Sequence, residues 1–371
     1  MVCRRQAELE LQPAVAGGRR VEPADRTRSP SDGQARRRYR GLMDHHPPLD
    51  PAVAETRLAV RTALGGLRPG AVVVALSGGA DSLALAAATA FEAPKLGMTL
   101  VSVTVDHALQ PGTAEVAEAA ARQAEALGFD ARVTRVEVTG DGGPEAAARA
   151  ARYRALADAA ASADAVAVLL GHTLDDQAES VLLGLARGSG AGSLQGMAAA
   201  SDLEGFALLR PLLGVHRATT RAACDAQGLD PWDDPHNDDP RFARVRVRRT
   251  VLPTLEAELG PGVAEALART AEQLREDAAA FAEMIDETIE DIVEHAEAGI
   301  SVSVAALAAN PAALRHRIIR HVVASEFGES LSRVQTLAVA RLVTDWAGQG
   351  PIDLPGCRAR RAGGRIEFTA R

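Results

Sequence analysis

The chain has 371 residues, of which 47% are hydrophobic and 24% charged, and its formal net charge is -8. This is the composition of a globular protein with enough apolar material for one large domain or two, and it excludes a wholly disordered or fibrous chain. If a polyanion such as RNA is the partner, a local basic patch must attract it, because the net charge of the whole molecule is unfavourable.

The cysteines and the apolar runs indicate a cytoplasmic protein that does not enter a membrane. Cys3, Cys224 and Cys357 are too far apart for a CxxC pair, and an odd number does not suit a disulfide framework. The apolar runs fall well short of the roughly 18 residues of a membrane span. No apolar stretch of a signal peptide follows the charged N-terminus.

Residues 1–45 are expected to form a disordered, Arg-rich tail, because Pro, Gly and Ser are frequent and no hydrophobic period is sustained. The arginine run at 36–40 could contact RNA nonspecifically. The favoured interpretation is a solvated tail, or an upstream start codon with Met43 as the true beginning.

From about residue 55 the chain alternates β-branched runs with alanine-rich helical stretches. The predicted strands are 71–76, 99–105, 132–138, 165–170 and 206–209. Strict alternation predicts an α/β fold with a doubly wound, Rossmann-like parallel sheet. In such sheets ligands bind beyond the carboxyl ends of the strands.

The loop after the first strand is predicted to bind phosphate. It reads Ser77, Gly78, Gly79, Ala80, Asp81, Ser82 and leads into a helix. Two glycines let the backbone turn close to an anion, and amides at the helix start face that anion with the positive end of the dipole. The lysine of a GxxxxGK[ST] loop is absent. The alternative is a tight turn in which Asp81 or Ser82 caps the helix.

The end of the fourth strand carries a second group of chemical side chains. Thr173 is a suitable N-cap, and a helix starting there places Asp176 and Glu179 on one face, with His172 just before it. Two carboxylates and a histidine can hold Mg²⁺ beside phosphates and orient or deprotonate an amine. The alternative is that these acids only interact favourably with the positive end of the helix dipole, and this alternative is preferred for Asp175.

Two later segments have the composition of nucleic-acid contacts. Residues 187–197 are glycine-rich, as in a loop that approaches a nucleic-acid backbone, although a flexible linker would look the same. Residues 241–249 hold five arginines beside Phe242, whose ring could stack on a base. These arginines supply the local basic patch that the acidic net charge requires, and a solvated helix face is the alternative.

Beyond Pro253 no further strands are expected until the C-terminus. Apolar residues three or four apart predict a long amphipathic helix over 263–292, followed by helices near 311–325 and 331–347. Two short strands are predicted around Gly363 and Gly364. The expected domains are 46–250 for catalysis, an all-helical, tRNA-contacting 251–350, and a β-hairpin at 351–371.

The loop SGGADS resembles that of the PP-loop ATP pyrophosphatase superfamily, whose fold is adenine nucleotide alpha hydrolase-like. This group includes GMP, asparagine and NAD synthetases, tRNA thiolases and tRNA(Ile)-lysidine synthetases. Within it, GHTLDDQAES at 171–180 and the arginine-bearing helix at 148–153 are similar to the lysidine synthetases. So are VDHALQ at 105–110, with Ala108 for a glycine and Gln110 for a basic residue, and the 187–197 segment.

The segment 232–253 is the most discriminating, since it resembles W-x-DPSN-x-D-x-x-F-x-RNxxR-x-x-LP of the lysidine synthetases. His236 replaces a serine and Val245 an asparagine. The resemblance implies that ATP activates the wobble cytidine of an isoleucine tRNA with a CAU anticodon, and that free L-lysine then displaces AMP to give lysidine. ATP and Mg²⁺ are the implied cofactors, and a homodimer is left open.

The resemblance also implies roles for single residues. Ser77 to Ser82 bind ATP, and Asp81, Arg152, His172 and Asp176 are catalytic. Asp81 and Asp176 hold metal, and Asp176 and Glu179 bind lysine. Arg187, Arg244 and Arg246 contact tRNA.

Two other classes of function were weighed against this hypothesis. A thiolase-type PP-loop enzyme would need paired cysteines, and the sequence has no CxxC. A noncatalytic nucleotide-binding or RNA-binding protein would not need the acids that follow the fourth strand. The single lysine, Lys95, lies outside every motif, which favours lysine as a substrate over a catalytic lysine side chain.

Overall fold

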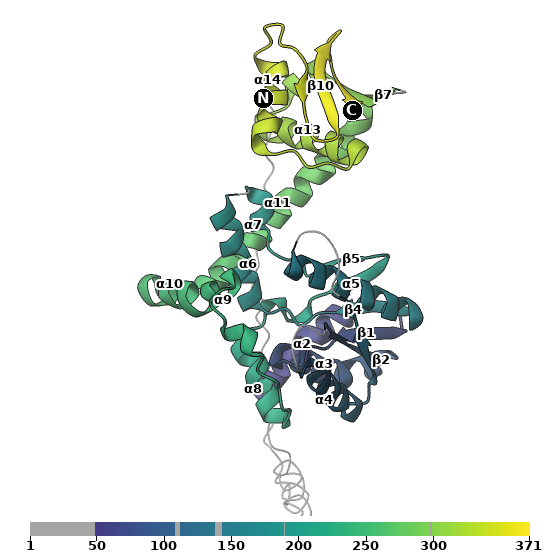
Figure 1. The fold of residues 1–371 in the computed structure, drawn as a ribbon, viewed down its shortest axis with the longest axis vertical. Helices are drawn as coiled ribbons and strands as arrows, with labels where there is room; N and C mark the ends of the chain where they lie inside the picture. Colours follow the sequence, from purple (N-terminus) through teal and green to yellow (C-terminus); the bar gives the residue numbers. More distant parts are fainter. Residues whose placement is uncertain (1–48, 108–111, 138–142, 189, 297–298) are drawn as a thin grey trace, which may run out of the picture. The chain divides into compact units, whose positions relative to one another are not determined.

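The computed structural model describes residues 49–371, apart from 108–111, 138–142, 189 and 297–298 (Figure 1). The expected Arg-rich tail, Cys3, and the two departures Ala108 and Gln110 therefore lie outside the described residues.

The first part of the described chain forms a six-stranded sheet in the order β3-β2-β1-β4-β6-β5, in which only β5 is antiparallel to its neighbour. Its strands are β1 (Ala71–Ala75), β2 (Thr99–Asp106), β3 (Asp130–Arg135), β4 (Ala165–Leu169), β5 (Ala200–Leu203) and β6 (Phe206–Leu209). The predicted doubly wound sheet is confirmed. Strand β5 was missed because its sequence, ASDL, has no apolar run.

Helices cover both faces of this sheet (Figure 1). They are α2 (Pro51–Leu64), α3 (Ala80–Glu92), α4 (Thr113–Ala126), α5 (Pro144–Ser162), α6 (Leu174–Arg187) and α8 (Arg217–Gln227), with 3-10 turns η1 (Ala93–Leu96) and η2 (Pro211–Gly214).

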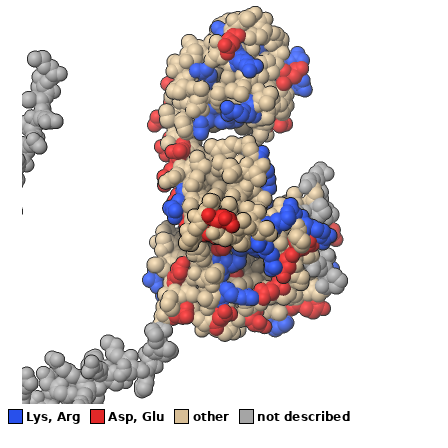
Figure 2. All heavy atoms as spheres, turned by 90° about the vertical axis from the view of Figure 1, so that its left-hand side faces the viewer, with Lys and Arg blue, Asp and Glu red and all other residues tan. Residues whose placement is uncertain are grey.

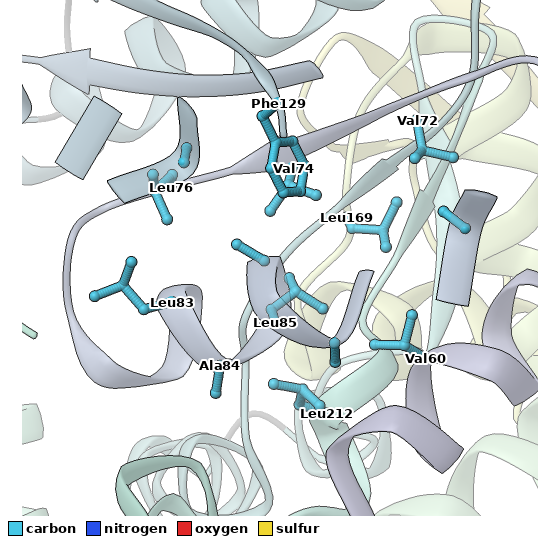
Figure 3. Close-up of a cluster of buried hydrophobic side chains, with 14 of the residues drawn as sticks. Val60, Val72, Val74, Leu76, Leu83, Ala84, Leu85, Phe129, Leu169 and Leu212 are labelled. Atoms are coloured by element: carbon cyan, nitrogen blue, oxygen red, sulfur yellow. The ribbon is translucent and has the colours of Figure 1, made fainter. Parts of the chain in front are cut away.

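Side chains of β1 alternate between two hydrophobic cores, as the period of a strand requires. Val72 and Val74 pack in a core with apolar residues of α2, α3 and α8, including Leu83 and Leu85 (Figure 3). Val73 lies in a second core with residues of α5. Burial on both faces explains why β1 reads as a continuous apolar run.

The order of strands creates a crevice between β1 and β4. The chain moves from β1 to β2 and β3 on one side, and then returns to β4 on the other side of β1. The connections therefore diverge beyond the carboxyl ends of β1 and β4, which is where ligands bind in open α/β sheets. The loop at 77–82 follows β1, and His172 follows β4.

The remaining helices before the C-terminal part are short. They are α7 (Ala191–Leu194), η3 (Pro235–Asp238), α9 (Ala243–Arg246), the π-helical turn η4 (Val247–Val251) and α10 (Leu252–Leu259). Leu252 of α10 packs with Leu174 and Ala178 of α6 and Ala264 of the next helix. This cluster connects the arginine-rich segment to the helix that carries Asp176 and Glu179.

The predicted long helix is confirmed as α11 (Val263–Ile292) and the predicted hairpin as β10 and β11. The expectation that strands are absent between Pro253 and the hairpin is wrong, because a five-stranded antiparallel sheet runs β7-β8-β11-β10-β9. Its strands are β7 (Val293–Ala296), β8 (Gly299–Ser303), β9 (Ile352–Asp353), β10 (Cys357–Ala362) and β11 (Arg365–Ala370).

Helices α12 (Val304–Ala309), α13 (Ala312–Phe327) and α14 (Arg333–Thr344) complete the C-terminal part. Ile318 of α13, Leu342 of α14 and Phe368 of β11 share one buried core. Strands β7 and β8 escaped prediction because four or five residues are too few to show a period. Within the described residues no helix is long and apolar enough to span a membrane.

Candidate functional site

The loop after β1 is closed on itself by one serine, and the helix that follows begins without a side-chain cap. Ser82 Oγ accepts a hydrogen bond from the Ser77 amide at 3.1 Å and donates one to the Gly79 carbonyl at 2.9 Å. Gly78 has φ of 83°, a conformation that favours glycine. Helix α3 begins after Gly79 without a side-chain cap, so the amides of its first turn can bind an anion.

Two segments that are distant in the sequence contact this loop. The Trp232 amide donates to the Gly78 carbonyl at 3.0 Å, which places the discriminating segment on the loop. Gly171, at the end of β4, lies so close that a Cβ atom there would be 3.0 Å from the Asp81 carbonyl oxygen. A larger residue at 171 would push the ends of β1 and β4 apart.

A cavity of about 440 Å³ opens beyond the ends of β1, β2 and β4. Five residues predicted from the sequence line it: Ser77, Asp81, Ser82, Arg152 and His172. Sequence reasoning assigned no role to Asp106, His107, Thr113, Trp232, Asp234 and His236, which also line it. On the molecular face drawn in Figure 2, basic and acidic side chains are interleaved.

Three side chains of this cavity carry buried nitrogens that have no hydrogen-bond partner within the described part of the chain. They are Nδ1 of His107, Nδ1 of His172 and Nε of Arg152. Burial lowers the pKa of all three groups from their ordinary values. A buried donor without a partner is costly, so these atoms point to a polar or anionic ligand in the cavity.

His172 is a neutral imidazole at physiological pH. Burial is the main reason that its pKa falls to about 4, with the nearby cations Arg210 and Arg152 adding to the effect against the opposing charge of Asp176. A neutral imidazole can accept a proton from an amine or hold a hydrogen bond to one.

The depressed pKa of His172 predicts a pH-dependent stability. An unfolded histidine binds its proton near pH 6.5 and folded His172 only near pH 4, so the unfolded chain holds more protons between these values. The folded protein therefore keeps its full stability with respect to this group above pH 6.5, and it loses stability as the pH falls from 6.5 toward 4. In that window wild-type protein should lose up to about 3 kcal/mol more stability than His172→Gln.

Denaturant unfolding at pH 7.5 and pH 4.5 measures this difference. His295→Gln is the matched control, because the His295 side chain is 72% exposed. Equal losses in wild type and His172→Gln would contradict the assignment of a neutral, buried imidazole.

Helix α6 begins with a capping box built from the predicted residues. Asp176 Oδ2 accepts from the Thr173 amide at 2.9 Å and from its hydroxyl at 3.0 Å, and Thr173 in turn caps the Asp176 amide. Thr173 is thus confirmed as the N-cap. Burial acts to raise the pKa of Asp176, but Arg217 and the Thr173 amide outweigh it and hold that pKa below its usual value.

Asp81, Asp176 and Glu179, here called the acid cluster, meet at one arginine that sequence reasoning missed. Arg217 donates to Asp81 Oδ2 at 3.4 Å, to Asp176 Oδ1 at 2.8 Å and to Glu179 Oε1 at 3.2 Å. No motif pointed to Arg217, because it stands alone at the start of α8, far along the chain from all three acids.

Glu179 is fully buried and is bound by further arginines of the 241–249 segment. Arg248 Nε donates to Glu179 Oε1 at 2.7 Å, and Arg244 Nε lies 3.6 Å from Oε2. The spacing of Arg244 and Arg248, four residues apart, was an available signal that both lie on one helix face. Arg244 was predicted from the sequence as a functional residue, and Arg248 was not.

The donor set around Asp81 and Asp176 does not fit a metal ion in this arrangement. The Arg217 guanidinium bridges the two carboxylates, and the Thr220 hydroxyl occupies Asp81 Oδ1. Across the described residues, no group of three His, Cys, Asp or Glu side chains could hold a metal. Mg²⁺ prefers several oxygen ligands around one point, which this cluster does not present.

Two predicted tRNA contacts are not brought to the acid cluster. Arg187 is exposed at the last residue of α6, about 12 Å along the helix from Glu179 by the rise per residue. Arg246 donates to the carbonyls of Pro240 and Arg241 and so stabilises its own loop.

The chain is similar to known proteins over most of its length. The PP-loop domain model matches residues 54–255, and the TilS substrate binding domain model matches residues 303–367. A tRNA(Ile)-lysidine synthase of Leifsonia xyli subsp. xyli is 61% identical over 305 residues, 81% of this chain and 91% of that relative. One of Salinispora tropica is 53% identical over 325 residues, 86% of this chain and 96% of the relative.

A solved structure supports the fold. The U34-tRNA thiolase NcsA from Methanococcus maripaludis, with its [4Fe-4S] cluster, aligns with a TM-score of 0.52 at 20% identity. The alignment covers 61% of this chain and 80% of the thiolase chain. At this identity the similarity concerns the fold alone.

Proposed function

The chain belongs to the tRNA(Ile)-lysidine synthase family, and from that premise we propose how its residues divide the reaction. It is a ligase that uses ATP to form lysidine in a tRNA. The observation that carries the division of roles is the cavity at the β1–β4 crevice, which places the phosphate-binding loop, Arg152 and His172 beside the acid cluster.

The reaction needs activation because an amide-like carbonyl is a poor electrophile. The C2 oxygen of the wobble cytidine attacks the α-phosphate of ATP, which forms an O–P bond and releases pyrophosphate. The ε-amine of free L-lysine then attacks C2, its C–N bond replaces the C–O bond to AMP, and the amine loses a proton. Both steps gain from fixed donors facing the developing negative charge.

The loop at 77–82 and Arg152 are assigned to ATP. The uncapped first turn of α3 offers amides to the phosphates, as in other helix N-terminal anion sites. Arg152, buried with an unpartnered Nε, faces the same cavity and stabilises the anionic adenylate. Asp81 belongs both to this loop and to the acid cluster.

The other end of the acid cluster is assigned to lysine. Asp176 and Glu179 lie one helical turn apart on α6, and both side chains are nearly or fully buried. Two buried carboxylates attract and orient an ammonium group. Neutral His172, in front of them, is placed to accept the proton that the attacking amine loses.

The tRNA is assigned to two basic surfaces. One is the arginine-rich segment with Arg244 and Arg246, to which the exposed Arg187 is added. The other is on the C-terminal helices, where Arg320 of α13 has a lowered pKa because it is partly buried near Arg317 and Arg333. Neither Arg320 nor Arg333 has a carboxylate partner among the described residues, which suits a phosphate ligand.

Replacing Arg244 and Arg246 with serine should weaken tRNA binding and flatten its dependence on salt. Each lost phosphate contact reduces the slope of log K against log salt by about one. Filter binding between 50 and 300 mM KCl measures the slope. An unchanged slope would exclude phosphate contacts for both, and a drop of about one would leave only one of the two arginines in that role.

The experiment that tests the proposed function is release of pyrophosphate from ATP with a CAU-anticodon isoleucine tRNA, with and without lysine. Release that needs this tRNA, and lysidine that needs lysine as well, would support it. A thiolase-type enzyme is not favoured, since the cysteines at 224 and 357 are both buried and unpaired. Free L-lysine as the second substrate, the use of Mg²⁺ and a cytoplasmic location stay predictions, while the contacts of Asp81 and Asp176 with Arg217 argue against these two residues as the Mg²⁺ ligands.

A further inference from the structure

Arg217 occupies a position that its local sequence does not explain. It is the first residue of α8, and its backbone amide donates to Asp175 Oδ2 at 2.8 Å, so its main chain is fixed to the start of α6. Its side chain is 25% exposed and extends into the acid cluster. Burial opposes the charge, but Asp176, Glu179 and Asp81 together hold the pKa of Arg217 above its usual value.

The Arg217 guanidinium links acids that follow two different strands of the sheet. Its Nε reaches Asp81, which follows β1, while Nη2 and Nη1 reach Asp176 and Glu179, which follow β4. Arg248 also contacts Asp176 and Glu179, but within the described part of the chain only Arg217 forms an ion pair with Asp81. Three separate nitrogens of one planar group therefore set the spacing of all three acids.

A lysine could not do the same. An ammonium is a point charge, whereas the guanidinium presents donors along a rigid fork. Without that fork, three like charges in a partly buried site repel each other. Within the described residues, Asp81 would also lose its one cationic partner, through which it is linked to the acids of α6.

We infer that Arg217 is a positioning residue that holds Asp176 and Glu179 in the geometry that receives the ammonium of lysine, and that aligns them with the ATP loop through Asp81. The inference rests on the proposed function, because that proposal assigns lysine to Asp176 and Glu179. The ammonium then binds beside Arg217 and does not take its place.

Steady-state kinetics of Arg217→Met and Arg217→Lys test this inference, with lysine and ATP varied separately. We expect Arg217→Met to raise KM for lysine at least 10-fold, with a smaller rise in KM for ATP, and Arg217→Lys to recover part of the loss. Pyrophosphate release without lysine should fall less than lysidine formation, because only the contact of Arg217 with Asp81 enters that half-reaction.

Arg221→Met is the matched control. Arg221 lies one turn further along α8 and pairs with exposed Asp233, away from the acid cluster. Its kinetics should match those of wild type. Far-ultraviolet circular dichroism checks folding, and if Arg217→Met does not fold, the same comparison of KM and kcat is made on Arg217→Lys alone.

Two results would overturn the inference. A lower KM for lysine would mean that Arg217 competes with the substrate for the acids. An unchanged KM, with or without a lower kcat, would mean that Arg217 serves only the fold. Failure of the proposed function is distinguishable, since wild-type enzyme would then form no lysidine at all.

Discussion

Asp176→Asn should lower lysidine formation by about 10²–10⁴-fold while tRNA binding stays as in wild type. An asparagine can still accept the hydrogen bond of the Thr173 amide, so α6 keeps its cap. It loses the negative charge that faces Arg217 and that orients the cationic lysine. Incorporation of labelled lysine into tRNA, beside filter binding of the same tRNA, measures the two quantities.

Comparison of Asp176→Ala with Asp176→Asn separates the effect of the charge from the effect of the helix cap. Alanine removes both, so this variant should show the same loss of activity as Asp176→Asn and also unfold more easily, by about 1 kcal/mol. Normal turnover by either variant would contradict the role of Asp176. An activity loss in Asp176→Ala alone would reduce Asp176 to a helix cap.

Arg152→Met should lower pyrophosphate release by about 10²–10³-fold, the usual loss when a fixed donor to a developing negative charge is removed. Unlike Asp176, Arg152 is assigned to the adenylation step, so its loss should appear even without lysine. Single-turnover release of pyrophosphate with saturating tRNA measures the effect directly.

The stability of Arg152→Met provides an independent readout. A buried guanidinium with an unpartnered Nε is unfavourable in the absence of ligand, and methionine fills a similar space without a charge. The variant should therefore be as stable as wild type or more stable in thermal unfolding, although it is nearly inactive. A large drop in melting temperature would show that Arg152 stabilises the fold.

Arg149→Met is the control on the same helix. Arg149 is exposed one turn before Arg152, where it donates to the Tyr153 hydroxyl at 3.0 Å. Its replacement should leave pyrophosphate release within about 3-fold of wild type, as expected for a surface position.

Much of the site could be predicted because its parts are local. The loop at 77–82 combines a buried strand, two glycines and a helix start within a few residues, and Thr173 and Asp176 form their capping box within one turn. Such patterns depend on backbone geometry and on hydrogen bonds between near neighbours. The long helix α11 was predictable for the same reason, since a repeat over 30 residues is a strong signal.

The rest depends on contacts between distant segments. Arg217 reaches Asp81 across 136 positions of sequence, and no local pattern marks either end of that pair. Strand β8 is only five residues long and becomes part of a sheet because β11 supplies its hydrogen bonds. A short strand has no independent stability, so its existence is decided by its partner.

The class of fold, the conformation of the loop at 77–82 and the capping box of α6 follow from the sequence alone, because each depends on a short run of residues whose backbone conformation is set locally. Only the tertiary structure decided which cations face those acids. Arg217, Arg244 and Arg248 form ion pairs with the acid cluster, while Arg246 donates to carbonyls of its own loop. The physical reason is that buried charges must be paired, and which arginine pairs with which acid depends on how β1, α6 and α8 pack.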